Sequence, residues 1–224
     1  MIEIEFRNVG KSFVDRQTSQ ARAAVSNVNL SIRSGEVVSI IGPSGCGKST
    51  LLNMGAGLYL PTSGEVLVGG ERVTKPVRKV AFMLQKDLLM PWRNIRANVA
   101  LGLQFVGHAL ARTLAVDPQV LLMDEPFSAL DAQTKMVLQQ DLAQMLFEKK
   151  KTALFITHDL VEAIALSDRL LVMSERPGTI IEEIEVNLPF RNNPLARRAL
   201  PEIGPLQGRL MELLKVGKET VELH

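Results

Sequence analysis

The residues of this chain that are best suited to chemistry form a glycine-rich run between two apolar segments. The run reads GPSGCGKST, follows the strand-like residues 37–41 and precedes the helix-like residues 51–56. Its glycines would let backbone N–H groups curl around phosphate oxygens, its lysine would reach the terminal phosphates, and its serine hydroxyl could ligate Mg²⁺. We therefore predict a nucleoside triphosphate site here, in preference to a glycine-rich turn that happens to carry a lysine. The predicted phosphate-binding residues are Gly42, Pro43, Ser44, Gly45, Cys46, Gly47, Lys48, Ser49 and Thr50.

Two adjacent carboxylates form the second group of candidate residues. Asp124 and Glu125 come directly after an apolar run in LLMDEP, residues 121–126. At the end of a buried strand Asp124 can hold Mg²⁺ through water, and Glu125 can take the proton from an attacking water. General-base catalysis of this kind contributes about 10²–10⁴-fold in rate, so the metal and the lysine must stabilise the charge on the transferring phosphoryl group. The alternative is an acidic strand end with no functional role. The phosphate-binding run in the same chain makes this alternative weaker.

Two kinds of apolar pattern predict the sheets that position these residues. Residues 2–6 and 28–32 alternate apolar and polar side chains, as half-buried antiparallel strands do, and predict an N-terminal β-layer. Residues 37–41, 120–123 and 153–156 are continuous apolar runs, typical of parallel strands covered on both faces. The fold class that follows is α/β, with a central, mostly parallel sheet and an N-terminal antiparallel layer.

The helices and the C-terminal segment follow from similar patterns. Helices are expected over residues 48–57, 132–149 and 160–166, and Asp131 can cap the second. Pro177-Gly178 predicts a turn, after which we expect a β-ribbon and a short helix over residues 206–214, so that residues 175–224 form a ribbon and a helix.

Composition limits the class of protein further. A chain of 224 residues with 46% hydrophobic and 4% aromatic residues predicts one aliphatic, well-packed domain over residues 1–224. The net charge of +2 is too small to predict a nucleic-acid partner. The only cysteine, Cys46, cannot form an internal disulfide, which fits a reducing, cytosolic setting. Polar residues interrupt the most apolar stretch, residues 95–116, so we expect membrane association only through another protein.

Two further motifs follow the carboxylates in a fixed order. SALD, residues 128–131, comes directly after DEP, and ITHD, residues 156–159, comes after the next strand. This series resembles the ATP-hydrolysing subunit of an ABC transporter, which implies a phosphate-loop NTPase fold, ATP and Mg²⁺ as cofactors, and a second ATP-binding subunit in a homodimer. It also implies that Asp131 contacts that subunit, that His158 reaches the γ-phosphate, and that Gln85 senses magnesium and the membrane partner. A lone histidine or glutamine at a strand end is otherwise more often structural.

Two longer segments resemble one subfamily of these transporters. LLMPWRNIRANVALGL, residues 88–103, and SERPGTIIEEIEVNLP, residues 174–189, are similar to importers of the nitrate, sulfonate and taurine type. The resemblance implies integral-membrane permease subunits, an indirect solute-binding partner and a peripheral place on the cytoplasmic face of the cell membrane. Residues 88–98 would face the permease with Trp92 as an anchor, although Trp92 is equally well a partly buried surface residue. Phe13 lies where the family stacks a ring on adenine, with a core phenylalanine as the alternative.

The chain departs from the family between Gln85 and Asp124. Only 38 residues lie between them, about half of the number typical of the family, and no LSGGQ-like signature occurs in the chain. We therefore expect residues 86–116 to form a shortened helical subdomain. Two functions remain open, an importer ATPase subunit and a non-hydrolysing relic or regulatory interaction protein. A DNA-repair or translation ATPase would need a coiled-coil insertion or tandem domains, and a small-molecule kinase has no use for SALD and ITHD.

Overall fold

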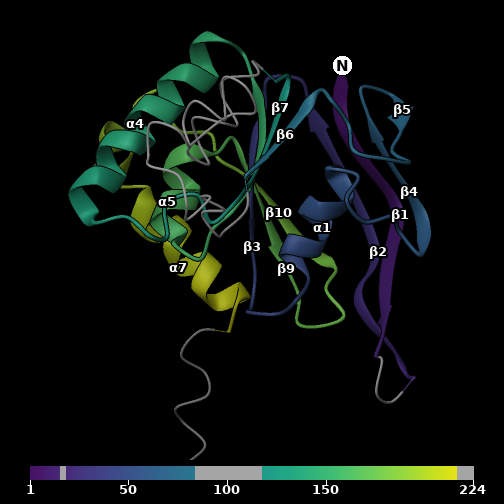
Figure 1. Cartoon of the computed structure of the whole chain (residues 1–224). Helices are drawn as coiled ribbons and strands as arrows, with labels where there is room; N and C mark the ends of the chain where they lie inside the picture. The colour runs from purple at the N-terminus through teal and green to yellow at the C-terminus, as the bar shows by residue number, and fades with distance from the viewer. Residues whose placement is uncertain (16–18, 84–117, 216–224) are drawn as a thin grey trace, which may run out of the picture.

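Two β-sheets form the framework of the chain in a computed structural model that describes residues 1–15, 19–83 and 118–215 (Figure 1). The smaller sheet is antiparallel, with the strands in the order β2 (Ala21–Arg33), β1 (Ile2–Val14), β4 (Ser63–Val68) and β5 (Glu71–Arg72). The larger sheet has the order β10 (Ile180–Glu185), β9 (Arg169–Met173), β3 (Val37–Ile41), β8 (Thr152–Ile156), β7 (Val120–Asp124) and β6 (Val80–Met83). Only the β10–β9 pair of this sheet is antiparallel, so the carboxyl ends of β3, β8 and β7 meet at one edge.

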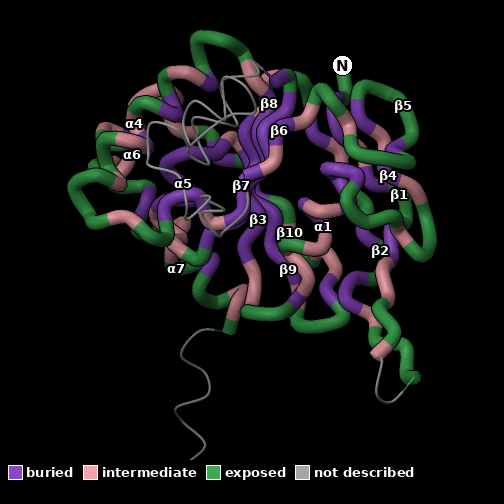
Figure 2. Tube along the Cα trace, viewed as in Figure 1, coloured by how far each residue is buried: buried purple, intermediate pink, exposed green. Residues whose placement is uncertain are grey.

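The helices cover the larger sheet on both faces. α1 (Lys48–Gly55) lies between the two sheets, where Leu51 and Leu52 share a core cluster with Phe6 of β1 and Val38 of β3. On the other face lie α4 (Ala132–Glu148), α5 (Leu160–Leu166), α6 (Pro194–Arg198) and α7 (Ile203–Leu213) (Figure 1). Every residue of β3, β7, β8 and β9 is therefore buried (Figure 2). No helix in the described ranges is long and apolar enough to cross a lipid bilayer.

The α/β fold class and the expected central strands are confirmed. β3 and α5 have the predicted bounds, and Asp131 caps α4 by accepting hydrogen bonds from the backbone N–H groups of Gln133 and Thr134 at 3.1 and 3.0 Å. α1 ends two residues earlier than expected and α7 begins three residues earlier, with Pro205 in its first turn, where a missing N–H costs nothing. β9 was not expected, although its sequence RLLVM has the apolar pattern of the other central strands. The predicted helical subdomain, residues 86–116, lies outside the described residues.

Candidate functional site

The glycine-rich run forms the turn between β3 and α1, and its two sides differ. Gly45 and Gly47 have φ of 75° and 110°, in the left-handed region that glycine adopts without strain. A Cβ on Gly45 would meet no atom within 4 Å, whereas a Cβ on Gly47 would lie 2.8 Å from the carbonyl oxygen of Ala24. The loop therefore has an open side, where a phosphate can approach the backbone, and a side packed against β2.

Lys48 begins α1 and turns its side chain back over this loop. Its Nζ donates hydrogen bonds to the carbonyl oxygens of Gly42 at 2.7 Å and Pro43 at 2.8 Å. The ammonium group thus lies at the N-terminus of α1, where the helix dipole and the first N–H groups also favour an anion. The same ammonium can exchange its two carbonyl contacts for phosphate oxygens.

Ser49 and Asp124, the two predicted metal-binding residues in the described ranges, are brought together. Asp124 ends β7, is buried, and lies close enough to the side chain of Ser49 for that hydroxyl to lower the pKa of the carboxyl group. Burial raises the pKa of the Asp124 carboxyl group, and the charge of Glu125 raises it further. The Ser49 side chain and the charge of Lys48 oppose this rise in pKa. A buried carboxylate of this kind gains from a nearby cation, and Mg²⁺ is typically held by one or two carboxylates together with substrate phosphates. The pair fits that metal.

Glu125 and His158 lie against each other at the ends of β7 and β8. Nδ1 of His158 is 3.5 Å from Oε2 of Glu125, and the histidine side chain is 71% exposed against 21% for the glutamate. Glu125 has φ of 48°, which a residue with a Cβ adopts at a cost, and its N–H donates to the carbonyl oxygen of Ile156 at 3.0 Å. Both side chains therefore stand at the same edge as Asp124, with the histidine at the rim.

A polar bridge that sequence reasoning missed holds α5, just after His158, against α4. Nζ of Lys135 lies 2.8 Å from Oδ2 of Asp159 and 2.7 Å from Oε2 of the buried Glu162. Burial would lower the pKa of Lys135, but the hydrogen bonds to both carboxylates outweigh it and raise that pKa. Asp159 also caps α5 by accepting from the N–H of Glu162 at 3.0 Å. In the sequence, Lys135 and Glu162 carried no predicted role, and Asp159 was noted only as the last residue of the ITHD motif.

Phe13 lies near the end of β1 and is 37% exposed, so the alternative of a core phenylalanine is wrong. Its ring meets Tyr59 edge to face at 5.6 Å between centroids, and Nζ of Lys11 lies 5.3 Å from its centroid. Adenine stacking on Phe13 stays a prediction. Of the other predicted residues, Gln85 and Trp92 lie outside the described residues, as do residues 88–98.

Comparisons with known proteins identify the family. The family model described as ABC transporter matches residues 25–109. The chain is 38% identical over 224 residues to an aliphatic sulfonates import ATP-binding protein, SsuB, of Bacillus thuringiensis subsp. konkukian, with 85% of this chain and 88% of the relative covered. It is 40% identical over 201 residues to a putative ATP-binding protein of Brucella melitensis biotype 1, with 84% of each chain covered. The chain belongs to the ATP-binding proteins of ABC transporters.

Solved structures agree with this assignment. The ATP-binding cassette MJ0796, as a dimer in a post-hydrolysis state bound to ADP and Pi, superposes with a TM-score of 0.71 at 27% identity. That comparison covers 83% of this chain and 99% of the cassette. The SsuB alignment spans 224 positions but only 85% of this chain, so the relative contributes positions that this chain lacks. This shortfall agrees with the short spacing between Gln85 and Asp124.

Proposed function

We propose that this chain is the ATP-binding subunit of an ABC importer and that it holds Mg-ATP at the loop between β3 and α1. The observation that supports this most directly is the meeting of Lys48, the Ser49–Asp124 pair and the Glu125–His158 pair at one edge of the larger sheet. Bound Mg-ATP would supply the γ-phosphoryl group and the charge of the metal. The remaining roles belong to side chains of this chain.

In this proposal each side chain has one task. Lys48 leaves the carbonyl oxygens of Gly42 and Pro43 for the terminal phosphates, and the Ser49–Asp124 pair holds the metal. Glu125 orients a water and takes its proton, while His158 meets the γ-phosphate from the rim. Gln85 would complete the metal site.

The importer assignment draws on the similarity to relatives. The Bacillus thuringiensis relative is named for the import of aliphatic sulfonates, and it matches most of this chain. We therefore propose a small solute of the nitrate, sulfonate or taurine class, permease subunits contacted by residues 88–98, and a place on the cytoplasmic face of the membrane. The dimeric state of the neighbouring cassettes favours a second copy of this chain as the partner that Asp131 faces.

Hydrolysis by this chain alone is proposed to be weak. In the family the signature loop of one subunit closes over the ATP held by the other, and this chain contains no LSGGQ-like sequence. A catalytic group supplied in trans, such as an arginine finger, is worth about 10³–10⁵ in rate. A family-like turnover of about 1–10 per second would then fall to roughly 10⁻² per second or less.

The absence of an LSGGQ-like sequence also favours a second function. A chain that binds ATP without hydrolysing it could occupy a permease or pair with an intact subunit as a regulator. The retained Lys48, Glu125 and His158 favour the first function, because a binding protein needs no general base.

Steady-state Mg-ATP turnover and a fluorescent-nucleotide titration on the same purified chain test the proposal. Glu125→Gln is the blank, since it keeps the size and most hydrogen bonds of the side chain but cannot accept the proton. Nucleotide binding with turnover indistinguishable from the blank supports the weak-hydrolysis proposal, and addition of an intact homologous subunit should then restore turnover. Ordinary enzyme rates from the chain alone would refute weak hydrolysis, and absence of nucleotide binding would refute the whole proposal.

A further inference from the structure

The turn between β9 and β10, residues 174–179, packs against the loop between β3 and α1. The turn is closed by the hydrogen bond from the N–H of Ser174 to the carbonyl oxygen of Thr179 at 3.0 Å, and by the bond from the N–H of Thr179 to Oγ of Ser174 at 3.1 Å. Pro43 of the loop lines one cavity together with Met173 and Ser174. The two segments are far apart in the sequence but share a packed contact.

Gly178 makes the closest part of this contact. A Cβ built on Gly178 would lie 2.1 Å from the carbonyl oxygen of Cys46 and 2.6 Å from Cε of Met173. The backbone of Gly178 is outside the left-handed region, so its conformation does not demand glycine. Glycine is required there because the middle of the phosphate loop occupies the space that a side chain would need.

The turn cannot simply move away, because β2 holds it. The N–H of Gly178 donates to the carbonyl oxygen of Ala24 at 3.0 Å, and its own carbonyl oxygen accepts from the N–H of Ser26 at 3.0 Å. Nε of Arg176 adds a hydrogen bond to the carbonyl oxygen of Ala23 at 2.8 Å. The same stretch of β2 closes off the space beside Gly47, so the turn and β2 together form the back wall of the loop.

We propose that Gly178 is a positioning residue of the nucleotide site and that the turn Ser174–Thr179 sets the shape of the phosphate loop. A side chain at this position would push the Cys46 peptide toward the open side at Gly45, where the backbone N–H groups must meet phosphate oxygens. The inference rests on the proposed nucleotide binding and is independent of hydrolysis.

Gly178→Ala tests the proposal, with Gly208→Ala as the matched control. Gly208 is an exposed residue of α7 at which a Cβ would meet no atom within 4 Å. We expect Gly178→Ala to weaken ATP and ADP binding by about tenfold or more, the effect of losing one charge-assisted hydrogen bond, and Gly208→Ala to leave both affinities unchanged. Displacement titrations against a fluorescent nucleotide measure this.

A second readout follows the loop itself. Cys46 is the only cysteine and is buried, so the rate at which a thiol reagent labels it reports the packing of the loop. Gly178→Ala should label faster than the wild type. Ile184→Val removes a buried methylene from β10 and serves as the control for a general loss of stability, expected to change neither nucleotide affinity nor labelling at a temperature far below Tm.

The outcomes separate the two proposals. Gly178→Ala with wild-type affinity, wild-type labelling and only a lowered Tm would overturn the positioning role. A wild type that binds no nucleotide would overturn the proposed function, while the labelling rates would still decide whether the turn shapes the loop. If Gly178→Ala does not fold, Arg176→Ala removes one hydrogen bond without a clash. It should show the same two changes at about two- to fivefold, and no change in either would overturn the proposal.

Discussion

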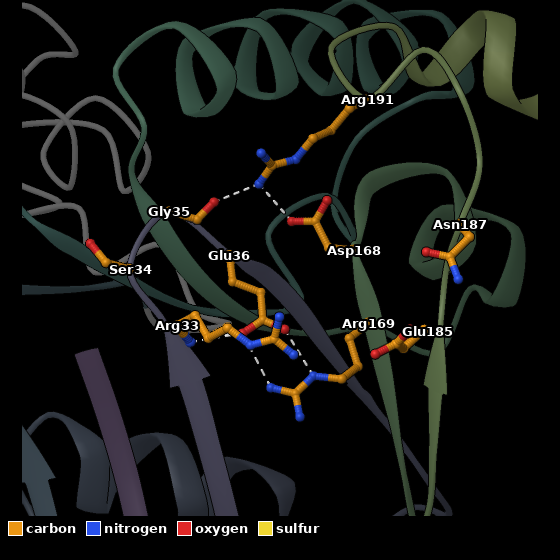
Figure 3. Close-up of a pocket in the computed structure, with 9 residues that line it drawn as sticks. All are labelled: Arg33, Ser34, Gly35, Glu36, Asp168, Arg169, Glu185, Asn187 and Arg191. Carbon is orange, nitrogen blue, oxygen red and sulfur yellow. Dashed lines mark hydrogen bonds and ion pairs between the residues drawn. The ribbon is translucent and has the colours of Figure 1, made fainter. Parts of the chain in front are cut away.

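The larger sheet has charged residues both at the edge formed by the carboxyl ends of its parallel strands and at the opposite edge, formed by their amino ends. The environments of these charges differ. At the edge that holds the phosphate loop, burial raises the pKa of Asp124, so its charged form is disfavoured, and Glu125 has a left-handed backbone. At the opposite edge, the residues that line a cleft of about 330 Å³ include two ion pairs (Figure 3). There Arg169 contacts Glu36 at 2.9 Å and Arg191 contacts Asp168 at 2.6 Å.

The difference agrees with the proposal that the phosphate-loop edge binds a nucleotide, whereas the opposite edge stabilises the fold. Burial would lower the pKa of Arg169, yet the hydrogen bonds to Glu36 and Glu183 outweigh it and raise that pKa, so the charged form is favoured. At the phosphate-loop edge burial disfavours the charged form of Asp124, and a bound metal ion would favour that form. Substitutions at the two edges should therefore change different measurements.

The largest effect is expected from Arg169→Met at the structural edge. This substitution leaves Glu36, whose side chain is 11% exposed, without its cation, and should lower the free energy of unfolding by about 3 kcal/mol while nucleotide affinity stays unchanged. Urea denaturation and a nucleotide titration measure the two quantities. Arg209→Met is the matched control, because its pair with Glu182 is exposed and should contribute less than about 1 kcal/mol. Equal losses for the two variants would contradict the distinction between the edges.

Lys48→Ala should show the reverse pattern at the phosphate-loop edge. Loss of the ammonium group should weaken ATP binding by about 2 kcal/mol, roughly thirtyfold, because a charge-assisted contact to phosphate is lost. The free energy of unfolding without nucleotide should change less than the free energy of ATP binding, since the contacts that disappear lie within the loop, to the carbonyl oxygens of Gly42 and Pro43 and to Sγ of Cys46. Lys79→Ala, an exposed lysine before β6, is the control for loss of positive charge alone. A large loss of stability with unchanged affinity would show that Lys48 is structural.

Lys135→Met tests whether one charge at the phosphate-loop edge is structural. Glu162 is buried, and without the lysine it keeps the hydrogen bond from Nε2 of Gln139 at 2.8 Å but loses its cation. We expect the free energy of unfolding to fall by about 1.5 kcal/mol, with recovery in Lys135→Arg. Thermal and urea unfolding of the three proteins measure this. Unchanged stability in Lys135→Met would show that Glu162 does not need the cation.

The smallest effect, and the only one expected to be stabilising, is that of Asp124→Asn. A carboxyl group whose folded-state pKa lies above its ordinary value of 3.8 stabilises the fold fully below that value, and this contribution is lost as pH rises through the folded-state pKa. At neutral pH the amide should therefore raise the Tm of the nucleotide-free protein slightly and remove the Mg²⁺ dependence of ATP binding. The Tm of the variant minus that of the wild type should increase as pH rises through the acidic range, because only the wild type loses the Asp124 contribution. A lowered Tm at neutral pH would contradict the burial argument.

Local sequence determined much of the fold and part of the candidate site. The apolar runs of β3 and β7, the capping of α4 by Asp131 and the phosphate loop were all visible, because each depends on a few adjacent residues and on a periodic pattern. The order of the parallel strands then brings Asp124 and the phosphate loop to one edge, since parallel strands share their carboxyl ends.

The tertiary structure alone decided which distant residues meet, both at that site and at the opposite edge of the sheet. Gly178 against Cys46, Lys135 against Glu162 and Arg169 against Glu36 join segments with no common local pattern, and a glycine in a turn or a lysine on a helix has the same local appearance whatever it contacts. Protein interiors are close-packed, so the conformation of the phosphate loop depends on the residues that pack against it. The sequence determined which groups can meet a nucleotide, and the packing of β2 and the β9–β10 turn decided how they are held.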